Sequence, residues 1–197
     1  MPEEAFYLAG GVGLLGVHAT LNIFFATKEP SLSVSALWAQ LRLAAGEQIE
    51  RASTSQTPTP SNLLTRLDLD REFAVKYAAY HYYRSRGWVV KSGIKFGAEY
   101  VLYKRGPIFR HSDYAVAVIP ALDAGDPEGH SVGRTRDWQW ALTLNRVCAQ
   151  ANKKVLLCHV LVPGNMTRAQ LNSPNCLRRL KVWDVCMGRW IPQKTRD

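Results

Sequence analysis

The sequence predicts an α/β (α+β) fold in which a central mixed sheet is flanked by helices, behind a small, mostly helical N-terminal domain. Three observations support this prediction. A helical pattern at residues 70–87 leads into short β-type runs, and a second helical pattern, at 137–151, separates two hydrophobic runs. Residues 47–62 are polar and contain two prolines, which indicates a linker. We therefore expect domains at residues 1–65, with the linker at 47–65, and at residues 66–197.

The N-terminal domain is expected to contain two helices. "PEEAFYLAGGVGLLGV" places Glu3 and Glu4 in a first helical turn, where carboxylates favour the helix dipole, and glycines where the helix ends. "SVSALWAQLRLAAG" has a cap at Ser33 and a terminal glycine.

Residues Phe6 to Ala26 are uncharged, and the segment is about as long as the ~20 residues that span a bilayer. Their glycines and polar residues, and the acids before them, favour buried segments, so we expect no membrane span.

The second domain begins with a helix capped by Asp70 and ended by Gly87, with Phe73, Tyr77 and Tyr80 at helical spacing. We interpret the tyrosines as core residues in preference to an RNA-stacking stripe. Strands are expected in "WVVKS", "AEYVLYK", "YAVAVIP", "KVLLCHVLV" and "LKVWDVCMGRW", with the crossover helix "DWQWALTLNRVCAQA" before the fourth.

The positive charge belongs to the second domain. The whole chain has a net charge of +9, yet residues 1–70 hold 4 basic and 7 acidic side chains, which leaves 21 and 9 for residues 71–197. This balance indicates a polyanionic or acidic partner for residues 71–197.

The sequence has four cysteines, and no two of them form a Cys-x-x-Cys pair. They are Cys148, Cys158, Cys176 and Cys186. We interpret them as buried free thiols and not as zinc ligands or a disulfide framework. No cofactor or metal site is expected.

The segment "YKRGPIFRH" joins two predicted strands and carries Tyr103 and His111 at its ends. Two interpretations of this segment are open: it is either a basic surface loop or a site arranged around a phosphate. Metal-free RNA cleavage needs a base, an acid and a cation that stabilises charge on phosphorus. Histidine exchanges protons near neutrality, and the cations Lys104 and Arg105 would favour the phenolate of the tyrosine.

Residues 80–118, "YHYYRSRGWVVKSGIKFGAEYVLYKRGPIFRHSDYAVAV", closely resemble the catalytic domain of the tRNA-intron endonucleases. "NRVCAQANKKVLLCHVLVP", "SPNCLRRLKVWDVCMGRW" and the N-terminal helix also resemble the eukaryotic subunit that cuts the 5′ splice site. The resemblance implies a restriction-endonuclease-like fold for residues 66–197. It also implies metal-independent cleavage of intron-containing pre-tRNA, which yields a 2′,3′-cyclic phosphate and a 5′-hydroxyl.

The resemblance implies a catalytic triad of Tyr103 as general base, His111 as general acid and Lys153 as the cation that stabilises the transition state. Lys154 is an alternative to Lys153, because a polar, Gly-rich insertion, "DAGDPEGHSVGRTRD", lengthens the segment before it. Strand alternation sends adjacent lysines to opposite faces, so only one should serve. Counting back from "LLCHV" favours Lys153.

The family also holds a flipped intron base between a cationic and an aromatic side chain. The resemblance makes Trp138 or Trp140 the candidate aromatic residue and Lys91 the candidate cation, although a guanidinium would stack better than an ammonium. The alternative is that both tryptophans are core or helix-surface residues. Lys104 and Arg105 complete the expected RNA-binding residues.

The resemblance implies a heterotetramer of two catalytic and two structural subunits. The chain's last strand is expected to pair with the structural subunit, and the implied location is the nucleus or the cytosolic face of the outer mitochondrial membrane. Two alternatives are a structural, RNA-binding subunit of the same complex and a metal-dependent, restriction-type nuclease. The first would have lost the triad, and the second needs carboxylates in an Asp with Glu-x-Lys arrangement that neither Glu72 nor Glu99 offers.

Overall fold

The computed structural model describes residues 1–8, 33–44, 73–123 and 136–188. Its centre is a five-stranded sheet in the order β1-β2-β3-β4-β5. The strands are β1 (Val89–Ser92), β2 (Tyr100–Tyr103), β3 (Tyr114–Asp123), β4 (Lys154–Pro163) and β5 (Lys181–Met187). Strands β3 and β4 are parallel and the other neighbouring pairs are antiparallel, so the predicted mixed sheet is confirmed.

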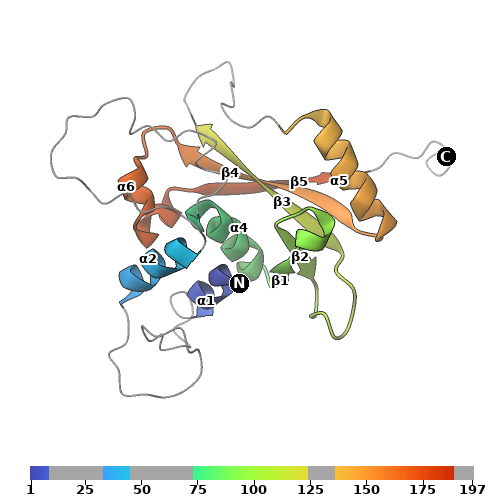
Figure 1. Ribbon diagram of the computed structural model, residues 1–197, viewed down its shortest axis with the longest axis horizontal. Helices are drawn as coiled ribbons and strands as arrows, with labels where there is room; N and C mark the ends of the chain where they lie inside the picture. Colours follow the sequence, from blue (N-terminus) through green and yellow to red (C-terminus); the bar gives the residue numbers. More distant parts are fainter. Residues whose placement is uncertain (9–32, 45–72, 124–135, 189–197) are drawn as a thin grey trace.

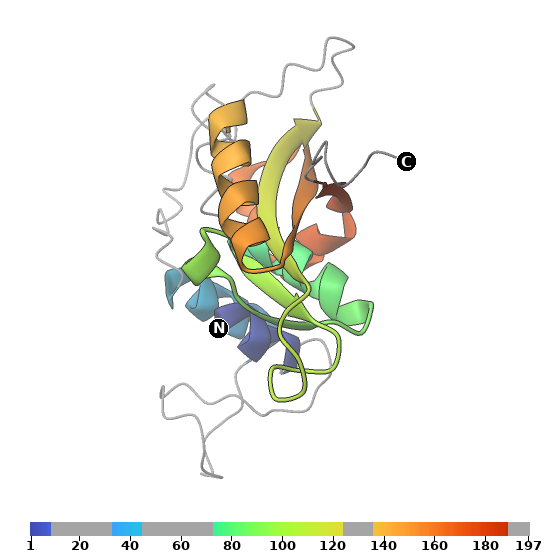
Figure 2. The same cartoon turned by 90° about the vertical axis from the view of Figure 1, so that its right-hand side faces the viewer.

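Helices cover both faces of the sheet (Figure 1). The α-helices are α1 (Pro2–Phe6), α2 (Val34–Ala44), α4 (Phe73–Ser85), α5 (Trp138–Gln150) and α6 (Arg168–Leu171), and the 3-10 helices are η3 (Ile94–Phe96) and η4 (Pro174–Arg178). Helix α4 lies on one face, with α1 and α2 beyond it. Helix α5 runs along the other face (Figure 2).

Helix α4 is buried between the sheet and helices α1 and α2, and its aromatic residues pack in both directions: Tyr77 contacts Phe6 of α1, whereas Tyr80 faces the sheet. Tyr77 and Tyr80 are each 1% exposed, which confirms their interpretation as core residues. Tyr80 packs edge-on against Tyr100 of β2, with 6.0 Å between ring centroids. The helix ends before Gly87, whose φ of +86° is a left-handed conformation that favours glycine. The predicted cap Asp70 lies outside the described residues.

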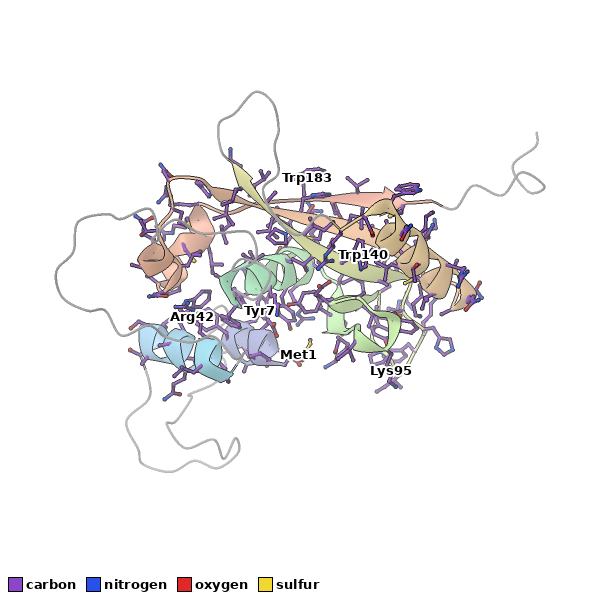
Figure 3. All side chains as sticks on the ribbon, turned by 45° about the horizontal axis from the view of Figure 1, so that its top comes forward. Met1, Tyr7, Arg42, Lys95, Trp140 and Trp183 are labelled. Carbon is purple, nitrogen blue, oxygen red and sulfur yellow. The ribbon has the colours of Figure 1, made fainter. Side chains whose placement is uncertain are left out.

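Helices α1 and α2 share the hydrophobic core of α4. The Trp38 ring lies 4.7 Å from that of Phe6 and 5.0 Å from that of Phe73, centroid to centroid. Its indole N–H donates to the carbonyl of Leu171 at the end of α6 (3.2 Å). Arg42 of α2 is buried and donates to the side chain of Asn172 (Figure 3). The predicted boundary near residue 65 lies outside the described residues, and the division into two domains stays a prediction.

Helix α5 closes a second, smaller core on the opposite face of the sheet, which we call the α5 cluster. Its buried members are Ala98, Val101, Ala115, Ala117, Leu144, Cys148 and Val155. The helix begins at Asp137, whose carboxylate accepts a hydrogen bond from the backbone N–H of Trp140 (2.8 Å). The α5 cluster lies next to the strand ends that carry the candidate active site.

Strand β5 is one of the two outer strands of the sheet, β1 being the other. The Tyr82 and Tyr83 hydroxyls of α4 donate to the two carboxylate oxygens of Asp184 (3.2 and 3.4 Å), which fixes β5 to the core. The outward side chains Trp183 and Val185 are 45% and 43% exposed. The strand therefore presents apolar side chains beside a strand edge that no other strand of the described residues pairs with.

The four cysteines are free, and Cys148, Cys158 and Cys176 are buried as predicted. The prediction is wrong for Cys186, which is exposed because it lies on the outer strand β5. No helix within the described residues is long and apolar enough to cross a membrane. Most of the segment Phe6 to Ala26 lies outside those residues.

Candidate active site

The ends of the three neighbouring strands β2, β3 and β4 lie side by side, at one end of the sheet. Leu102 of β2 pairs with Tyr114 of β3, and Tyr114 pairs in turn with Lys154 of β4. The residues one step beyond this row include Tyr103 and Lys153. The sheet register therefore brings two members of the expected triad to the same end of the sheet, although they are 50 residues apart in the sequence.

The turn between α5 and β4 gives the two lysines different environments. Asn152 adopts a left-handed φ of +52°, and the backbone N–H of Lys153 donates to the carbonyl of Cys148 at the end of α5 (2.9 Å). The Lys153 side chain is then buried, at 8% exposure, whereas Lys154 is exposed. The two adjacent lysines therefore differ in environment, one buried and the other in contact with solvent.

Lys153 is held by two contacts. Its Nζ donates to the backbone carbonyl of Ser112 (3.0 Å), and the same atom lies 5.0 Å from the centroid of the Phe96 ring. Burial raises the pKa of the nearby Cys148 thiol, while the positive charge of Lys153 acts in the opposite direction. The ammonium is thus fixed beside the residue that follows His111.

Tyr103 and His111 enclose the loop that joins β2 to β3. Tyr103 is half-buried and packs against the α5 cluster, as does Phe96. The N–H of Asp113 donates to the carbonyl of Leu102 (3.0 Å) and closes the base of the loop. His111 is exposed, two residues before this bond. Its imidazole can therefore reach a bound molecule in front of the strand ends.

Sequence reasoning did not identify Phe96. Its ring reaches Lys153 because the chain makes a tight turn at η3. A side chain at Gly93 would place its Cβ 2.7 Å from the carbonyl oxygen of Tyr100, so only glycine fits there. Gly97 has a left-handed φ of +71°. Lys95, on the same turn, lies at the end of the sheet from which the β2–β3 loop extends (Figure 3).

Lys104 and Arg105 begin the β2–β3 loop and are both exposed. Within the described residues, neither side chain forms an ion pair or a hydrogen bond. Arg110, at the other end of the loop, lies 3.6 Å from the carboxylate of Asp113. The two unpaired cations next to Tyr103 are therefore available to an anion.

The structure does not bring Lys91 and Trp138 together. Lys91 forms an ion pair with Glu4 of α1 (3.2 Å), whereas Trp138 is 69% exposed at the start of α5. Trp138 and Trp140 border a shallow hollow of about 490 Å³ that is also lined by residues of β3, β4 and β5. Arg136 lies over a tryptophan ring, with its guanidinium carbon 4.5 Å from the Trp140 centroid.

Both carboxylate oxygens of Glu99 accept hydrogen bonds from within the fold. One carboxylate oxygen accepts a hydrogen bond from the side chain of Arg136 (3.1 Å), and the other accepts from the backbone N–H of Val118 (2.9 Å). Across the described ranges, no three His, Cys, Asp or Glu side chains gather as metal ligands. Glu72 lies outside those ranges.

The chain is similar in sequence to known proteins. The family model described as tRNA intron endonuclease, catalytic C-terminal domain, matches residues 73–167. The chain is 34% identical over 195 residues to the mouse (Mus musculus) protein named tRNA-splicing endonuclease subunit Sen2, an alignment that covers 99% of this chain and 35% of the mouse protein. It is 38% identical over 130 residues to the Saccharomyces cerevisiae subunit of the same name, covering 64% of this chain and 32% of the yeast protein.

A further relative is the probable tRNA-splicing endonuclease subunit sen2 of Schizosaccharomyces pombe, 34% identical over 142 residues, with 66% of this chain and 36% of that protein covered. The chain thus spans about a third of the length of these relatives. The matched residues 73–167 include the strand ends of β2, β3 and β4 together with the loop that carries His111. The chain therefore belongs to the tRNA-intron endonuclease family.

Proposed function

We propose that the chain is the catalytic subunit of a tRNA-splicing endonuclease and cuts intron-containing pre-tRNA at the 5′ splice site. The observation that carries the proposal is the contact between Lys153 Nζ and the Ser112 carbonyl, which fixes a cation beside His111 at the edge where Tyr103 ends β2. The family domain and the names of the relatives favour the same activity.

The proposed reaction transfers one proton at each end of the scissile phosphate. Tyr103 takes the proton from the 2′-hydroxyl of the nucleotide before the cut, and the 2′-oxygen forms a bond to phosphorus. The bond from phosphorus to the 5′-oxygen breaks, and His111 protonates that oxygen. The products are a 2′,3′-cyclic phosphate and a 5′-hydroxyl.

Lys153 would stabilise the charge that develops on the phosphoryl oxygens. An ammonium has three N–H donors, and the Ser112 carbonyl takes one of them. The remaining donors can bind phosphate oxygens. Because the side chain is 8% exposed, its charge is less screened by water than that of the exposed Lys154. A fixed, weakly screened cation is the kind of group that lowers the energy of an anionic transition state.

The proposed partners are pre-tRNA, a structural subunit and a second pair of catalytic and structural subunits in a heterotetramer. Strand β5 supports pairing with a structural subunit, because no strand of the described part of the chain pairs with its outer edge, and Trp183 and Val185 are exposed beside that edge. The chain's positive charge suits RNA.

We also propose a nuclear location, with the cytosolic face of the outer mitochondrial membrane as the alternative. Imaging of the tagged chain beside nuclear and mitochondrial markers tests this: exclusion from both places would contradict it.

Cleavage of an intron-containing pre-tRNA by the co-expressed complex tests the function. The complex should cut the 5′ junction in excess EDTA, and His111→Ala should slow that cut by about 100-fold or more while the 3′ cut and RNA binding persist. Loss of all cleavage in EDTA would favour the metal-dependent nuclease. An unchanged 5′ cut in His111→Ala would favour the structural subunit.

A further inference from the structure

The β2–β3 loop, residues 104–113, carries two apolar side chains that nothing in the described structure covers. Ile108 is 91% exposed and Phe109 is 76% exposed. Figures 1 and 2 both show this loop extending away from the sheet and helices. An exposed phenylalanine forgoes about 2 kcal/mol of burial, so its presence at the tip favours a bound partner.

The loop is held in shape by its own contacts. Gly106 has a left-handed φ of +110°, and the N–H of Phe109 donates to its carbonyl (3.3 Å), which makes a turn at the tip. On the returning side, Arg110 is paired with Asp113. Phe109 is therefore held outward by a turn whose base is closed at Leu102.

The partner of this tip must suit both cations and an aromatic face. Phe109 lies between the exposed cations Lys104 and Arg105 on one side and Arg110 on the other. Single-stranded RNA offers both features, since its phosphates are anionic and its unpaired bases have flat faces that stack on aromatic rings. An apolar protein surface would suit Ile108 and Phe109 but leave Lys104 and Arg105 without partners.

We propose that Phe109 stacks on an unpaired base next to the scissile phosphate and so fixes the position of the RNA between Tyr103 and His111. This proposal rests on the proposed function, because it places the RNA at the same strand ends. Phe109 is two residues from His111, so a base on its ring lies within a nucleotide or two of a phosphate that the imidazole can reach.

Phe109 variants of the co-expressed complex test the stacking. Phe109→Ala should lower kcat/KM at the 5′ junction about tenfold, as expected for the loss of one stacked base. Phe109→Trp should restore cleavage and Phe109→Leu should not, because leucine is apolar but has no aromatic face. Leu142→Ala, which removes an exposed apolar side chain from α5, is the matched control and should cleave normally.

A second measurement uses 2-aminopurine, a fluorescent base, placed beside the 5′ junction of the pre-tRNA. Stacking on Phe109 should change its fluorescence on binding, and Phe109→Ala should remove that change without reducing co-purification of the other subunits. Equal kcat/KM and fluorescence in Phe109→Ala would overturn the proposal, as would loss of the partner subunits, which indicates a protein contact. If the wild type does not cut the junction, the proposed function fails, while a fluorescence change that depends on Phe109 still supports stacking.

Discussion

Lys153 donates a hydrogen bond to the backbone carbonyl of Ser112, 41 residues earlier in the chain, and so joins the turn before β4 to the loop that carries His111. Lys154, its neighbour, points to solvent. This contact distinguishes two residues that are chemically identical in the sequence, and the first prediction follows from it.

The two lysines should differ sharply in their effect on cleavage. Lys153→Met keeps most of the aliphatic stem but removes the cation, and it should slow the 5′ cut about 100-fold or more. Lys154→Met is the matched control and should change the rate less than threefold. Single-turnover cleavage of pre-tRNA measures both rates, and thermal unfolding checks that each variant is folded. Equal rates for the two variants would contradict the role given to Lys153.

Phe96 should act as a positioning residue through Lys153. Phe96→Leu removes the aromatic face 5.0 Å from Lys153 Nζ, and a cation–π contact of about 1 kcal/mol corresponds to a roughly fivefold slower cut. Phe96→Tyr should restore the rate, and pre-tRNA affinity should stay unchanged in both variants. Ile94→Ala, an exposed position on the same turn, is the control. A Phe96→Leu variant that loses affinity but keeps its rate would argue against positioning.

Tyr80 should make the fold less stable in strong alkali. Burial, with help from Glu4, raises its pKa from 10.0 to about 12. Between these pH values the unfolded chain releases the proton and the folded chain keeps it, so the free energy of unfolding falls as pH rises from 10 to 12. Below pH 10 both states hold the proton, and Tyr80 contributes no pH dependence.

Tyr80→Phe should therefore show a shallower loss of stability from pH 10 upward, measured by urea unfolding at pH 8, 10 and 11. Other buried tyrosines with raised pKa values, Tyr77 and Tyr100 among them, keep part of the wild-type slope. Val116→Ala destabilises the core without changing a titrating group and should retain the full slope. The same slope in Tyr80→Phe as in the wild type would show that this tyrosine ionises alike in both states.

The outer edge of β5 should bind the structural subunit. Val185 is 43% exposed, and Val185→Asp puts a charge on a surface that needs apolar contact. Co-purification of the structural subunit should fall at least tenfold, while Leu142→Asp on α5 should have little effect. Retention of the partner by Val185→Asp would mean that another surface forms the contact.

The sequence was a good guide to the elements because their signals are local. Nearly continuous apolar runs mark β3 and β4. The Ser33 hydroxyl accepts a hydrogen bond from the backbone N–H of Ala36 at the start of α2, as expected of a cap. It was a poorer guide to exposure on β5, since the burial of Cys186 depends on whether another strand lies beyond it.

The candidate site was also predictable only in part. Tyr103 and His111 could be predicted together because one short loop joins them, and the preference for Lys153 over Lys154 is consistent with the burial of Lys153. Phe96 could not be found, because its contact with Lys153 arises only when the η3 turn folds over the α5–β4 turn. Lys91 was chosen because the resemblance places a cation near its position, and the sequence contained no sign of its ion pair with Glu4.

Analysis of the RNA ends tests the central claim most directly. The co-expressed complex is incubated with pre-tRNA in excess EDTA, and the 3′ end of the 5′ exon and the 5′ end of the intron are identified by mass spectrometry. A 2′,3′-cyclic phosphate and a 5′-hydroxyl, absent at this junction with His111→Ala, are the predicted result. A 3′-hydroxyl with a 5′-phosphate, or a cyclic phosphate that forms as fast without His111, would contradict the account.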